Sequence, residues 1–314
     1  MSDSGLPTDA TRLPTLLTKD NINIFLDSFD NILADCDGVL WHGPEVIEGS
    51  RETLQYLLEC NKRVIYITND SNHTRQQITE KVNSKGFPGT QEHVMCPAFT
   101  LGHYLSAKKF HKKVYVVGSQ GVVDELKNFG ISSSPIGHDK VTDDDNLSDV
   151  MGRYSLDPDV GAVTVGFDLH ISLPKLAKAT SYASNPECLF LSMAPDENHK
   201  EQNNPLVLPG SGAFARCIAV AAQRDPIVIG KPSVHMFQAL QEIHQLDPTR
   251  TIIVGDRWSD IRFGHNNGLK TLLVLSGFSK LKDLEDAVSE TWSYRPHFYI
   301  NKLGDIMSLM KPDS

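Results

Sequence analysis

Short runs of apolar residues, each ending at a polar residue or a glycine, are the feature of this sequence that most constrains its fold. The runs are continuous rather than alternating, which is typical of strands buried on both faces of a parallel sheet. Segments with helical spacing lie between them, for example Phe214, Cys217 and Ile218. This alternation predicts an α/β fold with a Rossmann-like doubly wound parallel sheet as its core. The runs occupy residues 32–34, 64–67, 227–229, 252–254 and 272–275.

The middle of the chain repeats this rhythm on its own. Apolar runs at 114–117, 160–167 and 188–191 predict strands, residues 175–184 have a helical pattern, and the polar residues 134–149 predict a loop. We therefore expect a second α/β domain inserted into the first. The expected parts are a lead-in at 1–22, a core domain at 23–99 and 207–314, and an inserted domain at 100–206.

Composition narrows the class of protein. The chain has 314 residues and a formal net charge of -9, with a pI of about 5.7, which argues against a nucleic-acid partner. No apolar stretch approaches the length of a membrane span, so no membrane association is expected. The five cysteines are scattered without metal-binding spacing, which favours free thiols in a reducing compartment. The polar N-terminus lacks the features of a signal or transit peptide, and we expect a cytoplasmic protein.

Two aspartates, Asp35 and Asp37, follow the first apolar run and are themselves followed by Gly38. Asp and Gly are ordinary turn residues, so a turn is one interpretation. The other is a site for a cation and an anion together. With a phosphate ester, Asp35 could attack phosphorus, and Asp37 could protonate the leaving group and later deprotonate water. Gly38 would let a backbone N–H approach the anion.

Polar side chains follow the other runs as well. Each of them alone would usually be a surface lysine, a strand end or a helix cap. Ligands of doubly wound sheets bind beyond the carboxyl ends of the strands, so together they predict one site. Lys231 could hold a phosphoryl group, and Thr68 and Asn69 could donate hydrogen bonds to it. Mg²⁺ would offset the repulsion between phosphate and carboxylates, with Asp256 as a further ligand and Asp260 ligating or orienting the ion.

Four segments in chain order, "DCDGVLW", "YITNDSN", "VIGKPS" and "VGDRWSDI", resemble the four motifs of the haloacid dehalogenase (HAD) superfamily. The likeness extends over nearly the whole chain. The segments "AVTVGFDLHISLPKL", "VLPGSGAF" and "GLKTLLVLSG" are similar to the subgroup of 4-nitrophenylphosphatase, phosphoglycolate phosphatase and pyridoxal phosphatase. Members of this subgroup carry a large C2-type α/β cap between the second and third motifs, in agreement with the expected insertion.

The resemblance implies a role for each matching residue. Asp35 would be the nucleophile and a magnesium ligand. Asp37 would be the general acid/base, with its backbone carbonyl on magnesium. Asp256 would be the remaining protein ligand of the ion, with Asp260 in support. The phosphoryl group would be held by residues of the second and third motifs, namely Thr68, Asn69 and Lys231.

The resemblance thus implies a Mg²⁺-dependent phosphatase of small phosphate monoesters that acts through an aspartyl phosphate. Phosphoglycolate or 4-nitrophenyl phosphate is the first expectation for its substrate. Pyridoxal phosphate, sugar phosphates and nucleotides are alternatives on the same chemistry. A phospho-aspartate signalling domain would need a persistent phospho-Asp35, which the acid/base Asp37 argues against. A non-catalytic binding protein is a further alternative. Relatives commonly dimerise through their caps, so a homodimer is expected.

Two departures from the family pattern matter. The fourth motif reads "GDRWSDI", one residue shorter than the pattern GDRLxTDI, which leaves the role of Asp260 open. The cap loop at 192–198 reads "SMAPDEN" where relatives have a pattern like TNxD. Met193 and Ala194 replace Thr and Asn, while Asp196 is retained. The substrate preference therefore cannot be carried over from the resemblance.

Overall fold

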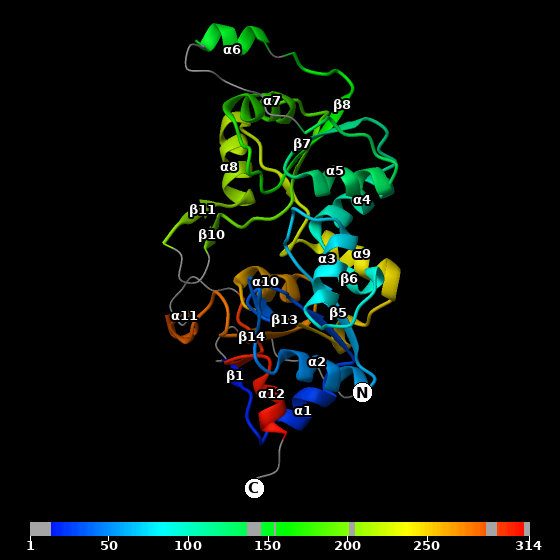
Figure 1. The fold of residues 1–314 in the computed structure, drawn as a ribbon, viewed down its shortest axis with the longest axis vertical. Coiled ribbons are helices and arrows are strands. Elements are labelled where there is room, and N and C mark those ends of the chain that lie inside the picture. Colours follow the sequence, from blue (N-terminus) through cyan, green and yellow to red (C-terminus); the bar gives the residue numbers. More distant parts are fainter. Residues whose placement is uncertain (1–13, 137–145, 154, 201–204, 287–293, 311–314) are drawn as a thin grey trace, which may run out of the picture. The chain divides into compact units, whose positions relative to one another are not determined.

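The computed structural model describes residues 14–136, 146–153, 155–200, 205–286 and 294–310 (Figure 1). The chain divides into two compact units. The first comprises Met1–Tyr66 and Leu246–Ser314, and the second comprises Ile67–Gln245. Each contains a parallel sheet with helices packed on it, so the predicted α/β class is confirmed.

The first unit is built on parallel strands in the order β1-β15-β14-β13-β2-β5. All residues of β13 are buried, as are the last three of β2, which explains their continuous apolar sequences. Helix α10 packs against β13 and β14. The elements of this unit are β1 (Thr15–Leu16), α1 (Ile22–Asp27), β2 (Asn31–Ala34), β3 (Trp41–His42), β4 (Glu45–Val46), α2 (Ser50–Glu59), β5 (Arg63–Ile67), the 3-10 helix η2 (Pro248–Arg250), β13 (Thr251–Gly255), α10 (Trp258–Asn266), β14 (Lys270–Val274), α11 (Leu281–Asp286), β15 (Phe298–Ile300) and α12 (Asp305–Leu309).

The second unit holds a four-stranded parallel sheet in the order β12-β9-β8-β7. Helices α7 and α8 pack against each other (Figure 1). Their buried apolar residues form one core with the strands. The elements are α3 (Arg75–Ser84), the 3-10 helix η1 (Gln91–His93), β6 (Val94–Met95), α4 (Pro97–Ala107), β7 (Lys113–Val117), α5 (Gln120–Asn128), α6 (Leu147–Arg153), β8 (Val160–Val165), α7 (Leu173–Ala183), β9 (Leu189–Ser192), β10 (Asn198–Lys200), β11 (Val207–Pro209), α8 (Ser211–Ala222), β12 (Ile227–Val228) and α9 (Val234–His244).

Four of the five predicted core strands are found where the sequence placed them, as β2, β5, β13 and β14. The fifth prediction is wrong about the sheet: the run at 227–229 forms β12, which pairs with β9 in the second unit. An apolar run shows that a strand is buried, but it does not identify the strand beside which it lies. The expectation that every run ends at the edge of one sheet therefore fails for this run.

Two segments predicted to lack regular structure each contain a short element. Thr15 and Leu16, within the predicted lead-in, form β1 beside β15. Part of the predicted loop at 134–149 forms the start of α6. The remainder of these two predictions falls largely on residues 1–13 and 137–145, which lie outside the described residues. The predicted core and cap boundaries stay a prediction.

Candidate active site

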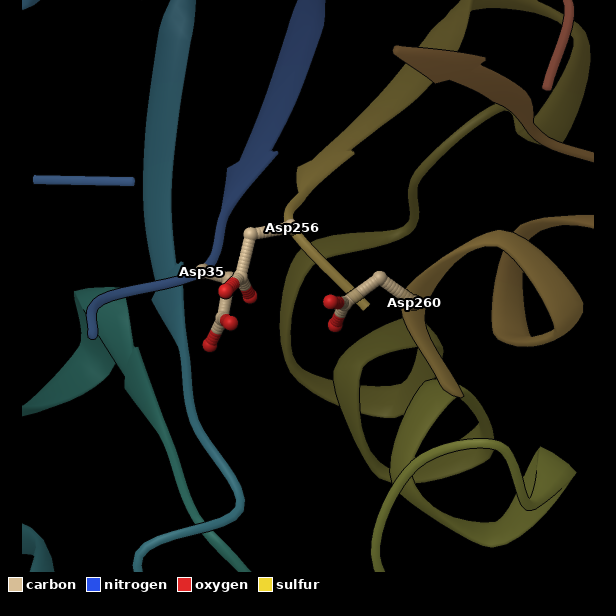
Figure 2. A group of neighbouring side chains, drawn as sticks. All are labelled: Asp35, Asp256 and Asp260. Atoms are coloured by element: carbon tan, nitrogen blue, oxygen red, sulfur yellow. The ribbon is translucent and has the colours of Figure 1, made fainter. Parts of the chain in front are cut away.

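Three aspartates meet at the carboxyl end of the sheet in the first unit. Asp35 directly follows β2, and Asp256 directly follows the neighbouring strand β13. Asp260 lies in the first turn of α10. One carboxylate oxygen of each residue lies within 4.8 Å of those of the other two, and Figure 2 shows the three side chains turned toward one another.

All three carboxylates are buried. The exposed fractions of Asp35, Asp256 and Asp260 are 7%, 2% and 0%. Burying like charges this close together is costly unless a cation offsets them. An all-oxygen donor set of carboxylates is the set that hard divalent cations such as Mg²⁺ prefer. The cluster therefore fits a divalent metal site.

A tight loop surrounds the side chain of Asp256. The backbone N–H of Phe278 donates to its Oδ2 at 2.6 Å, and the Ser279 N–H donates to its backbone carbonyl at 3.0 Å. Gly38, at φ +88°, and Gly277 both lie so close that a Cβ on either would overlap the Asp256 carboxylate. Asp256 is thus fixed by close main-chain contacts that are possible only because glycine has no side chain.

Gly38 contributes to the site by its small size. Its N–H donates to the Trp41 carbonyl at 2.8 Å, and its own carbonyl accepts from Ser276 Oγ at 2.7 Å. The Gly38 N–H thus closes the loop between β2 and β3, and the expectation that Gly38 lets a backbone N–H approach the substrate phosphate stays a prediction.

Asp37 differs from the other aspartates in being exposed. The indole Nε1–H of the buried Trp41 donates to its Oδ1 at 2.8 Å. This hydrogen bond fixes the direction of the carboxylate. Cys36, between the two aspartates, is buried as a packing residue.

Asp260 is held at the start of its helix. Its Oδ2 accepts from the backbone N–H of Arg257 at 3.1 Å, three residues earlier, in the manner of an N-terminal cap. Its backbone N–H bonds in turn to the Arg257 carbonyl at 3.1 Å. Asp260 therefore both stabilises the start of α10 and belongs to the carboxylate cluster.

In the second unit, the predicted phosphoryl-binding residues Asn69 and Lys231 come together. Lys231 is only 2% exposed, and its Nζ donates to the Ile67 carbonyl at 3.4 Å. Its backbone N–H donates to Asn69 Oδ1 at 2.9 Å. Thr68, also buried, accepts the Asp70 N–H on its Oγ1 at 3.0 Å. The structure thus assembles two groups of predicted site residues, one in each unit.

The turn after Thr68 and Asn69 is stabilised by Asp70. Burial alone would raise the pKa of this carboxyl, but hydrogen bonds with His73 and from the Asn72 N–H hold the pKa below its ordinary value. Asp70 is therefore ionised at neutral pH. An ionised carboxylate that accepts local N–H groups fixes the turn that carries the two residues before it.

Comparison with known proteins identifies the family. Residues 32–132 match the family described as haloacid dehalogenase-like hydrolase, and residues 228–306 match a HAD-hydrolase-like family. The chain is 35% identical over 308 residues to glycerol-3-phosphate phosphatase of Rattus norvegicus, covering 94% of this chain and 95% of that protein. The chain belongs to the haloacid dehalogenase-like hydrolases.

Other relatives extend this assignment. Phosphoglycolate phosphatase 2 of Arabidopsis thaliana is 35% identical over 306 residues, covering 95% of this chain and 99% of that protein. The structure of p-nitrophenyl phosphatase from Archaeoglobus fulgidus has the same fold, with a TM-score of 0.75 at 22% identity, over 90% of this chain and 99% of that one. The chain is a HAD-type phosphatase of small phosphomonoesters, in the subfamily with the C2 cap.

Several residues that shape the HAD site carried no signal in the sequence analysis. The loop at 276–279 directly follows the apolar run 272–275, and it surrounds Asp256. Its contribution comes from main-chain N–H groups and the absence of a side chain at Gly277. Trp41 is buried, and its indole N–H bonds Asp37.

The altered positions of the cap loop are packing residues. Met193 and Ala194 are both buried, and a Cβ on Gly166 would touch Met193. The Ala194 carbonyl accepts from Ser192 Oγ at 3.0 Å. Their departure from the family pattern therefore changes the interior of the second unit.

Proposed function

We propose that this phosphatase hydrolyses its ester through a phosphorylated Asp35. The observation that carries the proposal is the buried cluster of Asp35, Asp256 and Asp260 at the carboxyl end of the sheet. A carboxylate nucleophile is productive when nearby charge is neutralised and its direction is fixed. The position of Asp35 at the end of β2 supports the fixed direction, and a cation held by the carboxylate cluster would neutralise the charge.

The reaction is written in two steps. In the first, a carboxylate oxygen of Asp35 bonds to phosphorus while the ester P–O bond breaks, and Asp37 gives its proton to the leaving alkoxide. In the second, a water oxygen attacks phosphorus while Asp37 takes its proton, and the P–O bond to Asp35 breaks to release inorganic phosphate. The exposed position of Asp37 and its hydrogen bond from Trp41 support this role.

The metal is proposed to be Mg²⁺. Asp35 and Asp256 would hold it through carboxylate oxygens, Asp37 would hold it through its backbone carbonyl, and Asp260 would support the site. When bound, the ion would neutralise negative charge around the phosphoryl oxygens. The all-carboxylate cluster supports this choice over a softer metal, which would favour nitrogen or sulfur ligands.

Lys231 and Thr68 are proposed to hold the phosphoryl group, with Asn69 beside them. This assignment follows the family motifs that these residues match. Most lysines of folded proteins are exposed, so the buried position of Lys231 is unusual. Its positive charge suits a doubly charged phosphoryl group.

For the substrate, we propose a small anionic ester, with phosphoglycolate first and glycerol 3-phosphate second. Similarity to the phosphoglycolate phosphatase from A. thaliana and the glycerol-3-phosphate phosphatase from R. norvegicus supports these two candidates. Pyridoxal phosphate, sugar phosphates and nucleotides are the alternatives. The cap is proposed to comprise residues 100–206 and to exclude larger substrates.

A substrate panel tests the proposal. Phosphate release would be measured from 4-nitrophenyl phosphate, phosphoglycolate, glycerol 3-phosphate, pyridoxal phosphate and a nucleoside monophosphate, with Mg²⁺ and with a chelator. We expect release to need the metal, and Asp35→Asn to lower kcat by more than about a thousandfold. Release that persists with the chelator or with Asp35→Asn would contradict the mechanism.

We also propose a cytoplasmic homodimer that assembles through the cap. All five cysteines are free thiols, which supports a reducing compartment. No helix in the described part of the chain is long and apolar enough to cross a membrane.

The second unit exposes large apolar side chains, which supports an interface between copies: Leu169, Leu173, Leu206, Val207 and Val220. Sedimentation that shows only monomer would contradict the dimer.

A further inference from the structure

The side-chain amide of Asn69 forms two hydrogen bonds with the backbone of Lys231. The Lys231 N–H donates to Asn69 Oδ1 at 2.9 Å, and the Lys231 carbonyl accepts from Asn69 Nδ2 at 3.1 Å. This pair of contacts fixes which end of the amide is oxygen, because the peptide offers one donor and one acceptor.

The second hydrogen of the same Nδ2 is directed to the cap loop. Asp196 Oδ2 accepts from Asn69 Nδ2 at 3.1 Å. A carboxamide has two N–H donors, so the contacts to Lys231 and Asp196 use both. A carboxylate accepts hydrogen bonds and does not donate them, so this contact also favours the amide orientation that Lys231 needs. Hydrogen bonds to a charged acceptor are the stronger kind.

The cap loop is bonded to the same segment through its backbone. The Ile229 N–H donates to the Ser192 carbonyl at 2.8 Å, and the Gly230 N–H donates to the Met193 carbonyl at 2.9 Å. A Cβ on Gly230 would overlap the Met193 carbonyl and lie 2.7 Å from Asn69 Oδ1. The segment before Lys231 is therefore enclosed by the loop on one side and by Asn69 on the other.

We infer that Asn69 and Asp196 are positioning residues that set the backbone of Lys231 and so the place of its ammonium group. The inference rests on the proposed function, in which Lys231 holds the phosphoryl group. Asn69 acts here through Lys231, since its two amide hydrogens are already used. Asp196 is the residue of the cap loop that this sequence keeps from the family pattern, and its contact with Asn69 gives a physical reason for it.

Misplacing a charged group by a fraction of an ångström weakens both binding and catalysis. Loss of Asp196 should therefore weaken the binding of every phosphoryl group equally, whatever the leaving group. A residue that touched the leaving group would instead change the preference among esters and leave the binding of inorganic phosphate unchanged. This difference separates positioning from substrate contact.

The test compares Asp196→Ala, Asp196→Asn and Glu197→Ala. Glu197 is the adjacent exposed acid, and its backbone carbonyl rather than its side chain bonds the Gly210 N–H. The readouts are the Kd for inorganic phosphate with Mg²⁺, and kcat/KM for three esters of different size. We expect Asp196→Ala to raise the phosphate Kd about tenfold or more, with an equal factor in kcat/KM on all esters. Asp196→Asn keeps an acceptor and should recover most of the loss, and Glu197→Ala should resemble wild type.

A third readout does not depend on activity. In protein labelled with ¹⁵N-asparagine, the Asn69 Nδ2 signals, assigned by their loss in Asn69→Ser, should shift in Asp196→Ala and stay in place in Glu197→Ala. An unchanged Asn69 signal in Asp196→Ala, or an unchanged phosphate Kd with altered ester preference, would overturn the inference. If wild type releases no phosphate from any ester, the proposed function fails, while the amide signal still decides the positioning. Melting temperatures would show whether Asp196→Ala folds, and Asp196→Asn gives the same test in a less disruptive variant.

Discussion

Replacing Asp260 by asparagine should stabilise the metal-free protein and weaken its response to Mg²⁺. Asp260 is fully buried in the carboxylate cluster, where ligand oxygens lie within 4.8 Å of one another. Two unit charges at that distance repel by about 3.5 kcal/mol at an effective dielectric constant of about 20. Burying the new amide has a cost of its own, so we expect a smaller gain of about 1–3 kcal/mol in the free energy of unfolding without metal.

Asparagine is the right replacement because it keeps the structural contact. Its Oδ1 can still accept the Arg257 N–H, so the helix cap should survive. With Mg²⁺ at about a hundred times its Kd, the wild-type protein should gain about 2.7 kcal/mol. If the loss of Asp260 raises that Kd tenfold or more, the gain falls to about 1.4 kcal/mol or less.

The assay is urea unfolding of wild type and variant, each with a chelator and with Mg²⁺. Asp283→Asn is a matched control, because Asp283 Oδ2 accepts the Lys280 N–H three residues earlier at 2.7 Å, as Asp260 does for Arg257. This control lies outside the described carboxylate cluster and should respond to Mg²⁺ as wild type does. The reasoning would be refuted if Mg²⁺ stabilised wild type and Asp260→Asn equally. It would also be refuted if Asp260→Asn lost as much stability without metal as Asp283→Asn does.

Three further predictions concern residues around the site and in the first unit. Gly277→Ala should lower the free energy of unfolding by about 1–3 kcal/mol and weaken Mg²⁺ binding, since its Cβ would overlap Asp256; unchanged calorimetric affinity would contradict this. Trp41→Phe removes the hydrogen bond that fixes the Asp37 carboxylate, so kcat should fall several-fold while the Kd for Mg²⁺ stays the same. An unchanged kcat would argue against Trp41 as the partner of the acid/base. Burial, followed by nearby positive charge, lowers the pKa of His297 to about 4. The unfolded chain therefore binds the extra proton first, and stability should fall by up to about 3 kcal/mol as pH drops from about 6.5 to about 4. His297→Asn should flatten that part of the pH–stability curve, and a curve of unchanged slope would show that another group is responsible.

The sequence was informative where a residue's role depends on its neighbours along the chain. Asp35 and Asp256 were predicted to lie at strand ends because apolar runs precede them, and both strands are adjacent in the sheet. Lys231 follows a similar run, yet β12 pairs with β9 instead. A strand as short as β12, with two apolar residues, can lie at the edge of either sheet, and only its neighbours in the folded protein decide which.

Main-chain contacts explain what the sequence analysis missed. The Phe278 N–H bonds Asp256, but every residue other than proline has such a group, so no residue type marks it. The contact of Asn69 with Lys231 joins positions 162 residues apart in the chain. Residue types alone predicted that both belong to the site, whereas the bonding between them needed the fold.

The central claim is that Asp35 carries the phosphoryl group during turnover. The most direct measurement is acid quenching of the enzyme during hydrolysis of an ester labelled with radioactive phosphorus, followed by peptide mapping. The account predicts label on the peptide that contains Asp35, present with Mg²⁺ and absent in Asp35→Asn. It also predicts that Asp37→Asn accumulates more label with 4-nitrophenyl phosphate, because that leaving group needs no proton while the attacking water does. Release of phosphate by wild type without label on that peptide, or label that persists in Asp35→Asn, would contradict the account.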